Sequence, residues 1–212
     1  MELDVTLIYG IRFMQLILAS IQLWMEELEM LSQNKFHSKD TSHWVAMERS
    51  YLNILKTFEH FKAIYQSLIL LKSTGFFIRA LLYLQIIMEI LNLETENGTI
   101  YLGTISKIAM FSNEVKDFGL LFHVCVECEV FYLRINDVST LASVTRNREG
   151  CPEILRKLCK NVTRLNSMPI RMTACSVFTV DAAFPLRLLA VVTTYSLVLL
   201  QFNTSNLLIQ IC

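Results

Sequence analysis

An uncharged apolar stretch at the C-terminus, residues 188–212, constrains the fold of this chain more than any other feature. Its 25 residues include no Asp, Glu, Lys, Arg or His. Because a helix rises about 1.5 Å per residue, about 20 apolar residues are enough to cross the hydrocarbon core of a bilayer. The stretch also contains uncharged hydrogen-bonding side chains, which are costly in hydrocarbon unless they face another helix or water: Thr193, Thr194, Tyr195 and Gln201. We therefore predict a final membrane span at 176–205, whose polar groups either join helices or face water.

The composition of the whole chain is that of a membrane protein. Hydrophobic residues make up 53% of the 212 residues and charged residues 18%, whereas soluble domains carry about 25% charged residues. The formal net charge is zero, and no basic patch interleaved with aromatic residues occurs, which argues against a nucleic-acid partner. The sequence contains no HExxH, P-loop, GxGxxG or GxSxG motif, and its four His residues show no metal-ligand spacing. We therefore predict no enzyme activity, no catalytic residue, no metal and no cofactor.

The pair Cys125-x-x-Cys128 has the spacing of half a zinc site. A complete site needs a second pair at matching spacing, but Cys151 and Cys159 are eight residues apart and have no His nearby. The first pair ends an apolar run, where thiols serve as small buried hydrophobic groups. We predict reduced cysteines that pack in a core.

The N-terminal third predicts two helices of different character. Residues 1–31 contain an apolar run broken only by Arg12, which is either a membrane span or the lower part of one that continues as an amphipathic helix. A polar loop at 33–42 follows. Residues 48–64 then carry apolar side chains at helical spacing with charges between them, which predicts an amphipathic helix outside the membrane core.

Two further spans are predicted at 65–91 and 101–126. Lys72 and Arg79 are seven residues apart and therefore share a helix face. Charges at membrane depth usually face a bundle interior or an aqueous cavity. We expect Lys72 to extend to the cytoplasmic surface and leave a functional role open for Arg79. Four charges interrupt the second span and either line a cavity or lie partly outside the membrane: Lys107, Glu114, Lys116 and Asp117.

The distribution of basic residues predicts the orientation of the chain. The segment 131–173 contains eight Lys or Arg against three Asp or Glu between positions 134 and 171. Basic loops remain in the cytoplasm. The acidic loop at 92–100 and the C-terminus would then be extracellular.

Three glycosylation sequons can report this orientation. Asn97 lies in the predicted extracellular loop and is expected to be modified. Asn161 would be cytoplasmic and unmodified. Asn203 would be outside, but too close to the membrane and to the chain end for modification.

The final span carries a short motif. Thr194 and Tyr195 are followed by five mostly apolar residues and then by Gln201 and Phe202. This pattern resembles the signature of the insect gustatory receptor family, which lies in the last transmembrane helix of that family. The resemblance covers the chain well from about residue 125 onward and loosely before it.

Two upstream segments resemble the same family at consistent spacing. Residues 172–181, MTACSVFTVD, are similar to a TACGLFTLD-like stretch before the last helix, with Ser176 where a small Gly is often found. The block 153–165, with Pro169 after it, resembles the helix-then-Pro segment that leads into this stretch. The chain departs from the family pattern at two positions before the last helix, Pro185 and Arg187.

The resemblance implies a seven-helix chemoreceptor of the insect gustatory and odorant receptor superfamily, of which this chain would be an N-terminally truncated member. The chain would be an all-α, polytopic membrane bundle of about three to four spans. It would correspond to the C-terminal half of the receptor and include a cytoplasmic helical anchor. The implied activity is that of a ligand-gated, non-selective cation channel in the plasma membrane that detects small-molecule tastants. Family members assemble as tetramers, here homo- or hetero-tetramers in contact with membrane lipid.

The resemblance also implies roles for individual residues. Gln201 would offer an amide to a partly dehydrated cation, and Phe202 could form a hydrophobic constriction. Thr194 and Tyr195 complete the set of pore or gate residues. The ligand pocket would lie in the outer halves of the helices, where the candidates are Arg79, Tyr83 and Gln85. Two alternatives remain open: an odorant-receptor-type subunit, or a truncated or accessory multi-span protein without ligand-gated activity.

Overall fold

The protein is almost entirely helical. The computed structural model describes residues 2–33, 41–97, 101–168 and 170–211. It contains the helices α1 (Glu2–Gln33), α2 (Thr41–Asn97), α3 (Tyr101–Arg146), α4 (Glu153–Asn166) and α5 (Phe184–Ile211). A two-stranded antiparallel hairpin of β1 (Thr173–Ala174) and β2 (Phe178–Thr179) precedes α5. The predicted all-α class is confirmed.

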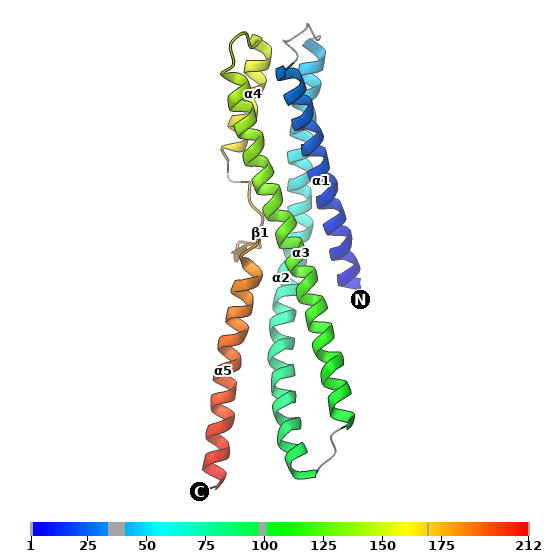
Figure 1. Ribbon diagram of the computed structural model, residues 1–212, viewed down its shortest axis with the longest axis vertical. Coiled ribbons are helices and arrows are strands. Elements are labelled where there is room, and N and C mark those ends of the chain that lie inside the picture. Colours follow the sequence, from blue (N-terminus) through cyan, green and yellow to red (C-terminus); the bar gives the residue numbers. More distant parts are fainter. Residues whose placement is uncertain (1, 34–40, 98–100, 169, 212) are drawn as a thin grey trace.

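Two long helices organise the molecule. Figure 1 shows α2 and α3 running side by side along its whole length, with α1 and α4 packed against their upper halves. The hairpin lies at mid-height, and from there α5 runs downward beside α2. The N-terminus of α1 also lies near mid-height. The chain therefore forms an upper four-helix half and a lower three-helix half.

The hydrophobic core lies mainly in the four-helix half. The rings of Phe58 on α2 and Phe131 on α3 are stacked with centroids 3.9 Å apart, and both side chains are buried. Trp24 of α1 is also buried, and its indole Nε1 donates a hydrogen bond to the carbonyl of Met47 at 3.0 Å. Burial of these rings, together with the aliphatic side chains of the core, stabilises the bundle.

Residues 48–64, predicted as an amphipathic helix outside the membrane core, and residues 65–91, predicted as a span, form one continuous helix, α2. No Gly or Pro interrupts the junction at residue 65, so nothing in the backbone ends the helix there. The change from amphipathic to apolar sequence along α2 therefore reflects a change in what surrounds the helix and does not mark its end. The predicted loop at 92–100 is also too long, since α2 continues to Asn97.

Two other predicted boundaries require correction. The helix predicted as a span at 101–126 continues without a break to Arg146, into the segment 131–173 that was predicted to contain a cytoplasmic loop and helices. The helix block at 153–165 is confirmed by α4. The final helix begins at Phe184, eight residues after the predicted start at 176, because the intervening residues form the end of the hairpin. Pro185 is compatible with this start, since the first turn of a helix needs no backbone N–H from it.

Three helices are long and apolar enough to cross a membrane. The segments that meet this condition are Asp4–Leu31, Ser42–Ile87 and Phe184–Gln201. This indicates a membrane protein. Within the described residues, α3 does not meet the condition, in agreement with the charges that interrupt it.

Candidate functional site

A tight turn connects the two strands before α5. Cys175 and Ser176 have positive φ angles of 48° and 63°, and the Val177 N–H bonds to the Ala174 carbonyl at 2.9 Å. Two consecutive residues with positive φ characterise a type I′ turn, which matches the twist of a two-stranded hairpin. Glycine adopts this conformation without the steric cost that other residues incur. The position where the resembled family often has Gly is therefore one where this chain holds a strained Ser.

Replacing Ser176 by Gly is expected to raise the free energy of unfolding by about 1 kcal/mol, because glycine removes the clash of Cβ in the left-handed region. Thermal unfolding of the detergent-solubilised protein measures the change. The matched control is the next residue, Val177, which is exposed and lies outside the positive-φ pair. A Val177→Gly substitution should be neutral or destabilising. A Ser176→Gly protein that is less stable than the parent would contradict the assignment.

Tyr132 of α3 attaches the hairpin to the helix bundle. Its hydroxyl accepts a hydrogen bond from the Met172 N–H at 2.9 Å and donates one to the Val180 carbonyl at 3.0 Å. Met172 and Val180 flank the two strands and are buried. Burial raises the pKa of the Tyr132 phenol above its usual range, so the hydroxyl keeps the proton that it donates. One side chain thus satisfies a donor and an acceptor of the hairpin backbone.

The first turn of α5 is fixed by a ring contact and an ion pair. Phe178 of β2 stacks on Phe184 with ring centroids 4.0 Å apart and planes 7° from parallel. Arg187 donates through Nη2 to both carboxylate oxygens of Asp181, at 2.8 and 2.6 Å. Further along the helix, the ring of Tyr195 meets the ring of Phe77 on α2 edge-on, with centroids 5.7 Å apart. These contacts hold one side of α5 against the bundle.

The opposite side of α5 is uncovered. Thr194, Leu197 and Gln201 lie at i, i+3 and i+7, so they share one face, and all three are exposed. The Thr194 hydroxyl bonds back to the Ala190 carbonyl at 2.9 Å. Ser196 lies across the helix from Thr194 and is half-buried. The exposed face therefore combines apolar surface with a few uncharged polar groups.

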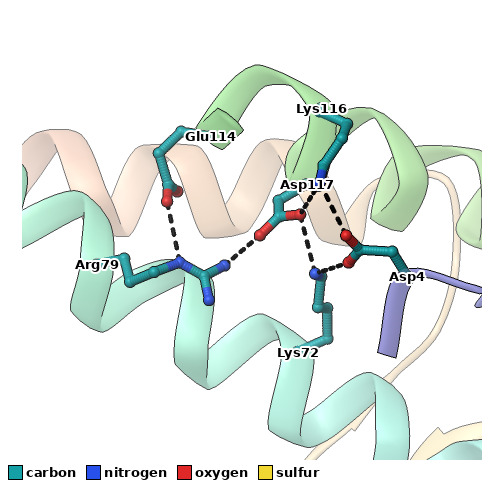
Figure 2. A network of polar contacts seen from close by, with 6 residues as sticks. All are labelled: Asp4, Lys72, Arg79, Glu114, Lys116 and Asp117. Carbon is teal, nitrogen blue, oxygen red and sulfur yellow. Dashed lines mark hydrogen bonds and ion pairs between the residues drawn. The ribbon is translucent and has the colours of Figure 1, made fainter. Parts of the chain in front are cut away.

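A network of six charged side chains joins α1, α2 and α3 (Figure 2). Lys72 bonds to Asp4 and, at 2.9 Å, to Asp117. Arg79 bonds to Asp117 and, through Nε, to Glu114 at 3.0 Å. Lys116 completes the network by donating to Asp4 at 2.8 Å. Asp117 lies at the centre, since both α2 cations bond to its carboxylate.

The network is charge-balanced and largely buried. It contains three cations and three carboxylates, and the side chains of Lys72 and Asp117 are only 6% and 4% exposed. Two of these charges are therefore taken out of water, which requires close partners. The expectation that Lys72 extends to the membrane surface is wrong, because its ammonium group points into the bundle between two carboxylates. The prediction that Lys72 and Arg79 share a face is confirmed by their common partner.

The network marks the level where the two halves of the molecule meet. α1 starts at Glu2, its Asp4 lies beside Lys72, and the helix runs along the first part of α2. α5 starts beside Ser73 and Thr74 and runs along the second part of α2. The two apolar helices α1 and α5 therefore leave this level in opposite directions. A single bilayer that encloses one of them along its length cannot also enclose the other.

The other candidate residues lie in different parts of the structure. Tyr83 is half-buried on α2 and Gln85 is exposed, whereas the charge of Arg79 is committed to Glu114 and Asp117. Asn97 is the last residue of α2, and the side chain of Phe202 lies outside the described part of the structure.

Cys125 and Cys128 are fully buried in the core, where Cys128 Sγ lies 3.9 Å from Met172 Sδ. Burial also raises the pKa of the Cys159 thiol to about 12, so this cysteine is protonated at neutral pH. Among the residues that the structure describes, no group of three or more His, Cys, Asp or Glu side chains could hold a metal ion. The four buried cysteines therefore serve as packing groups, whereas Cys175 is exposed in the turn of the hairpin.

The contacts of Asp4 with Lys72 and of Tyr132 with Met172 were not predicted from the sequence. Asp4 pairs across a separation of 68 residues with Lys72, and Tyr132 bonds across 40 residues to Met172. Neither residue belongs to a motif. The one sequence feature that pointed to Asp4 was Lys72 on α2. A buried cation requires an anion, which can come from elsewhere in the chain.

Comparison with known protein families finds no family model that matches this chain. A comparison with curated proteins likewise finds no match.

Proposed function

We propose that this protein is a subunit of a ligand-gated, non-selective cation channel of the insect gustatory receptor type, acting in the plasma membrane on small-molecule tastants. The observation that carries the proposal is the uncovered face of α5, which bears the Thr194 and Gln201 positions of the motif. An exposed face of a membrane helix with spaced, uncharged polar groups suits the wall of a pore that lies between subunits. A tetramer, homomeric or heteromeric, would bring such faces together around one axis.

The two-half architecture supports the orientation that this function needs. With α5 in the bilayer, its 28 residues extend about 42 Å, enough to cross the membrane. The upper four-helix half, including α1, then lies in the cytoplasm as a helical anchor, despite the apolar composition of α1. The exposed basic residues of α4 and of the preceding turn lie in the same half, in agreement with the positive-inside rule: Arg148, Arg156, Lys157, Lys160 and Arg164.

An exposed apolar row on α1 supports assembly through the anchor. Tyr9, Leu16, Leu23 and Met30 recur every seven residues and are 69%, 65%, 67% and 59% exposed. A seven-residue apolar repeat presents one continuous seam to a neighbouring helix. In an aqueous compartment, such a row requires cover from another helix.

The decisive experiment is expression of the chain in oocytes, with recording of cation currents during application of a panel of sugars and alkaloids. A channel with this pore predicts a cation current whose relative permeabilities change in a Gln201→Ala variant, because the substitution removes an amide that faces the ion. Ser196→Ala is the matched control, since Ser196 lies on the opposite side of α5 and should leave permeation unchanged. Surface expression is measured for each variant.

The absence of any current above that of uninjected cells, with the chain at the cell surface, would reject the channel proposal for the chain by itself. Co-expression with other subunits then distinguishes a heteromeric channel from an accessory membrane protein. If the Gln201→Ala variant yields less folded protein, but the folded fraction has unchanged relative permeabilities, Gln201 serves helix contacts and does not line the pore.

The orientation can be tested by glycosylation. Asn97 ends α2 at the far end from the basic half and is expected to carry a glycan in insect or mammalian cells. An Asn97→Gln substitution should abolish the mobility shift that an endoglycosidase produces. Asn161 serves as the control: it lies in α4, and its Nδ2 donates to Glu48 at 3.0 Å. Loss of the glycan in an Asn161→Gln protein would invert the proposed topology.

A further inference from the structure

A cavity of about 330 Å³ lies where α5 leaves the hairpin and meets α2. Its wall is formed by side chains from all three elements, chiefly Thr74, Phe77, Phe178, Phe184, Leu188 and Val191. The cavity lies before the Thr194, Leu197 and Gln201 positions along α5, and none of the six residues of the charged network lines it. It lies at the first turns of the candidate span Phe184–Gln201, at the level where the two halves of the molecule meet.

The wall of this cavity is apolar even where its residues carry hydroxyl groups. The Ser73 Oγ donates to the Ile69 carbonyl at 2.7 Å, and the Thr74 Oγ1 donates to the Leu70 carbonyl at 2.9 Å. These hydroxyls are satisfied by their own helix, so the wall offers mainly methyl groups and aromatic rings. A polar molecule would lose hydration there without compensation, whereas an apolar chain gains by entering.

A single cation stands at the rim. Arg187 is the only Asp, Glu, Lys, Arg or His residue in α5, and its side chain is 57% exposed. Both of its bonds to Asp181 come from Nη2, so the guanidinium can still present Nε and Nη1 to a further acceptor. The Asp181 carboxylate beside it is 16% exposed. The rim thus carries the Arg187 guanidinium, which can bind a phosphate, next to the Asp181 carboxylate, which can bind an amine.

We propose that the cavity binds one acyl chain of a zwitterionic membrane phospholipid, with the lipid phosphate at Arg187 and the headgroup amine near Asp181. The proposal rests on α5 crossing the bilayer and is independent of ion conduction. With α5 in the membrane, the cavity lies at the inner boundary of the hydrocarbon, where headgroups and acyl chains meet. The lipid fills the gap between α5 and α2 and contributes to the position of the helix.

The test uses the full chain in nanodiscs with a phosphatidylethanolamine probe that carries a photoreactive diazirine in one acyl chain. Cross-linked peptides are identified by mass spectrometry. A Thr74→Phe substitution should reduce labelling of the α2 and α5 peptides about tenfold, as expected if the added ring excludes about two methylene groups. Thr193→Phe is the matched control, because Thr193 is also exposed, bonds to its own i−4 carbonyl at 2.8 Å, and does not line the cavity.

Two further arms identify the ligand. Arg187→Gln should weaken labelling by the phospholipid probe while sparing labelling by a diacylglycerol that carries the same diazirine chain. Val191→Trp fills the cavity from the other helix and should reproduce the effect of Thr74→Phe if that variant folds poorly. Equal labelling in the Thr74, Val191 and Thr193 variants, or cross-links spread evenly around α5, would show only surrounding bulk lipid and overturn the proposal. Cross-links to a second copy of the chain at this site would also overturn it, since a protein would then occupy the cavity.

Discussion

Replacing Asp117 by Leu is expected to lower the free energy of unfolding by about 3–5 kcal/mol, the largest effect predicted for a single substitution in this protein. Asp117 bonds to both Lys72 and Arg79, and its side chain is 4% exposed. Without it, the Lys72 ammonium remains buried with Asp4 as its partner in the network. The penalty arises because a buried charge that loses a partner recovers little solvation from water. Denaturant titration of the solubilised chain measures this change.

The double variant Lys72→Met with Asp117→Leu should recover most of the lost stability. Removing both residues leaves two complete ion pairs, Asp4 with Lys116 and Arg79 with Glu114. Replacement of a buried ion pair by apolar side chains of similar volume is often neutral, whereas removal of one member is costly. The difference between the double variant and the sum of the single variants gives the coupling energy of the pair.

An exposed ion pair provides the control. Lys62 and Glu59 are 3.9 Å apart on α2, and the Glu59 side chain is 60% exposed. Glu59→Gln should change the unfolding free energy by less than about 0.5 kcal/mol, as is usual for solvated pairs. An Asp117→Leu protein with parental stability, or a double variant as unstable as the sum of the two single variants, would refute the assignment of the network as a buried, mutually dependent unit.

The second large effect is expected for Tyr132→Phe, which should cost about 2–4 kcal/mol. The substitution keeps the ring but removes the hydroxyl that bonds to the Met172 N–H and the Val180 carbonyl. Both residues are buried, so each backbone group would lose its partner away from water. The hairpin should then separate from α3 more often. Amide hydrogen exchange should therefore accelerate at Val177 and Val180 while the amides of α4 remain protected.

Tyr9→Phe is the matched control for this prediction. The same hydroxyl is removed, but Tyr9 is 69% exposed on α1, so stability and exchange should remain unchanged. Unchanged exchange in the hairpin of the Tyr132→Phe protein would mean that the strand pairing alone holds the hairpin. In that case, α5 would be positioned by its contacts with α2, and the tyrosine bridge would have no role in attaching it.

The helical class, the final apolar helix and the helix at 153–165 were predictable from the sequence, because each depends on local information. An uncharged stretch longer than 20 residues admits few structures other than a helix in a membrane or in a core. The periodic apolar pattern of α4 likewise depends only on neighbouring residues, and its burial at Leu155, Leu158 and Val162 follows that pattern. The shared face of Lys72 and Arg79 follows from helical geometry alone.

The tertiary structure decided what those residues contact. The length of α2 was not predictable because a change from amphipathic to apolar sequence does not show whether a helix ends or only enters new surroundings. The burial of Lys72 depends on Asp4 and Asp117, which come from two other helices. The opposite directions of α1 and α5 likewise follow from the tertiary structure, in which both helices pack against different parts of the one continuous helix α2. Local patterns determine which segments are helical, but long-range packing determines which charges meet and which apolar faces remain uncovered, because those contacts join residues far apart in the chain.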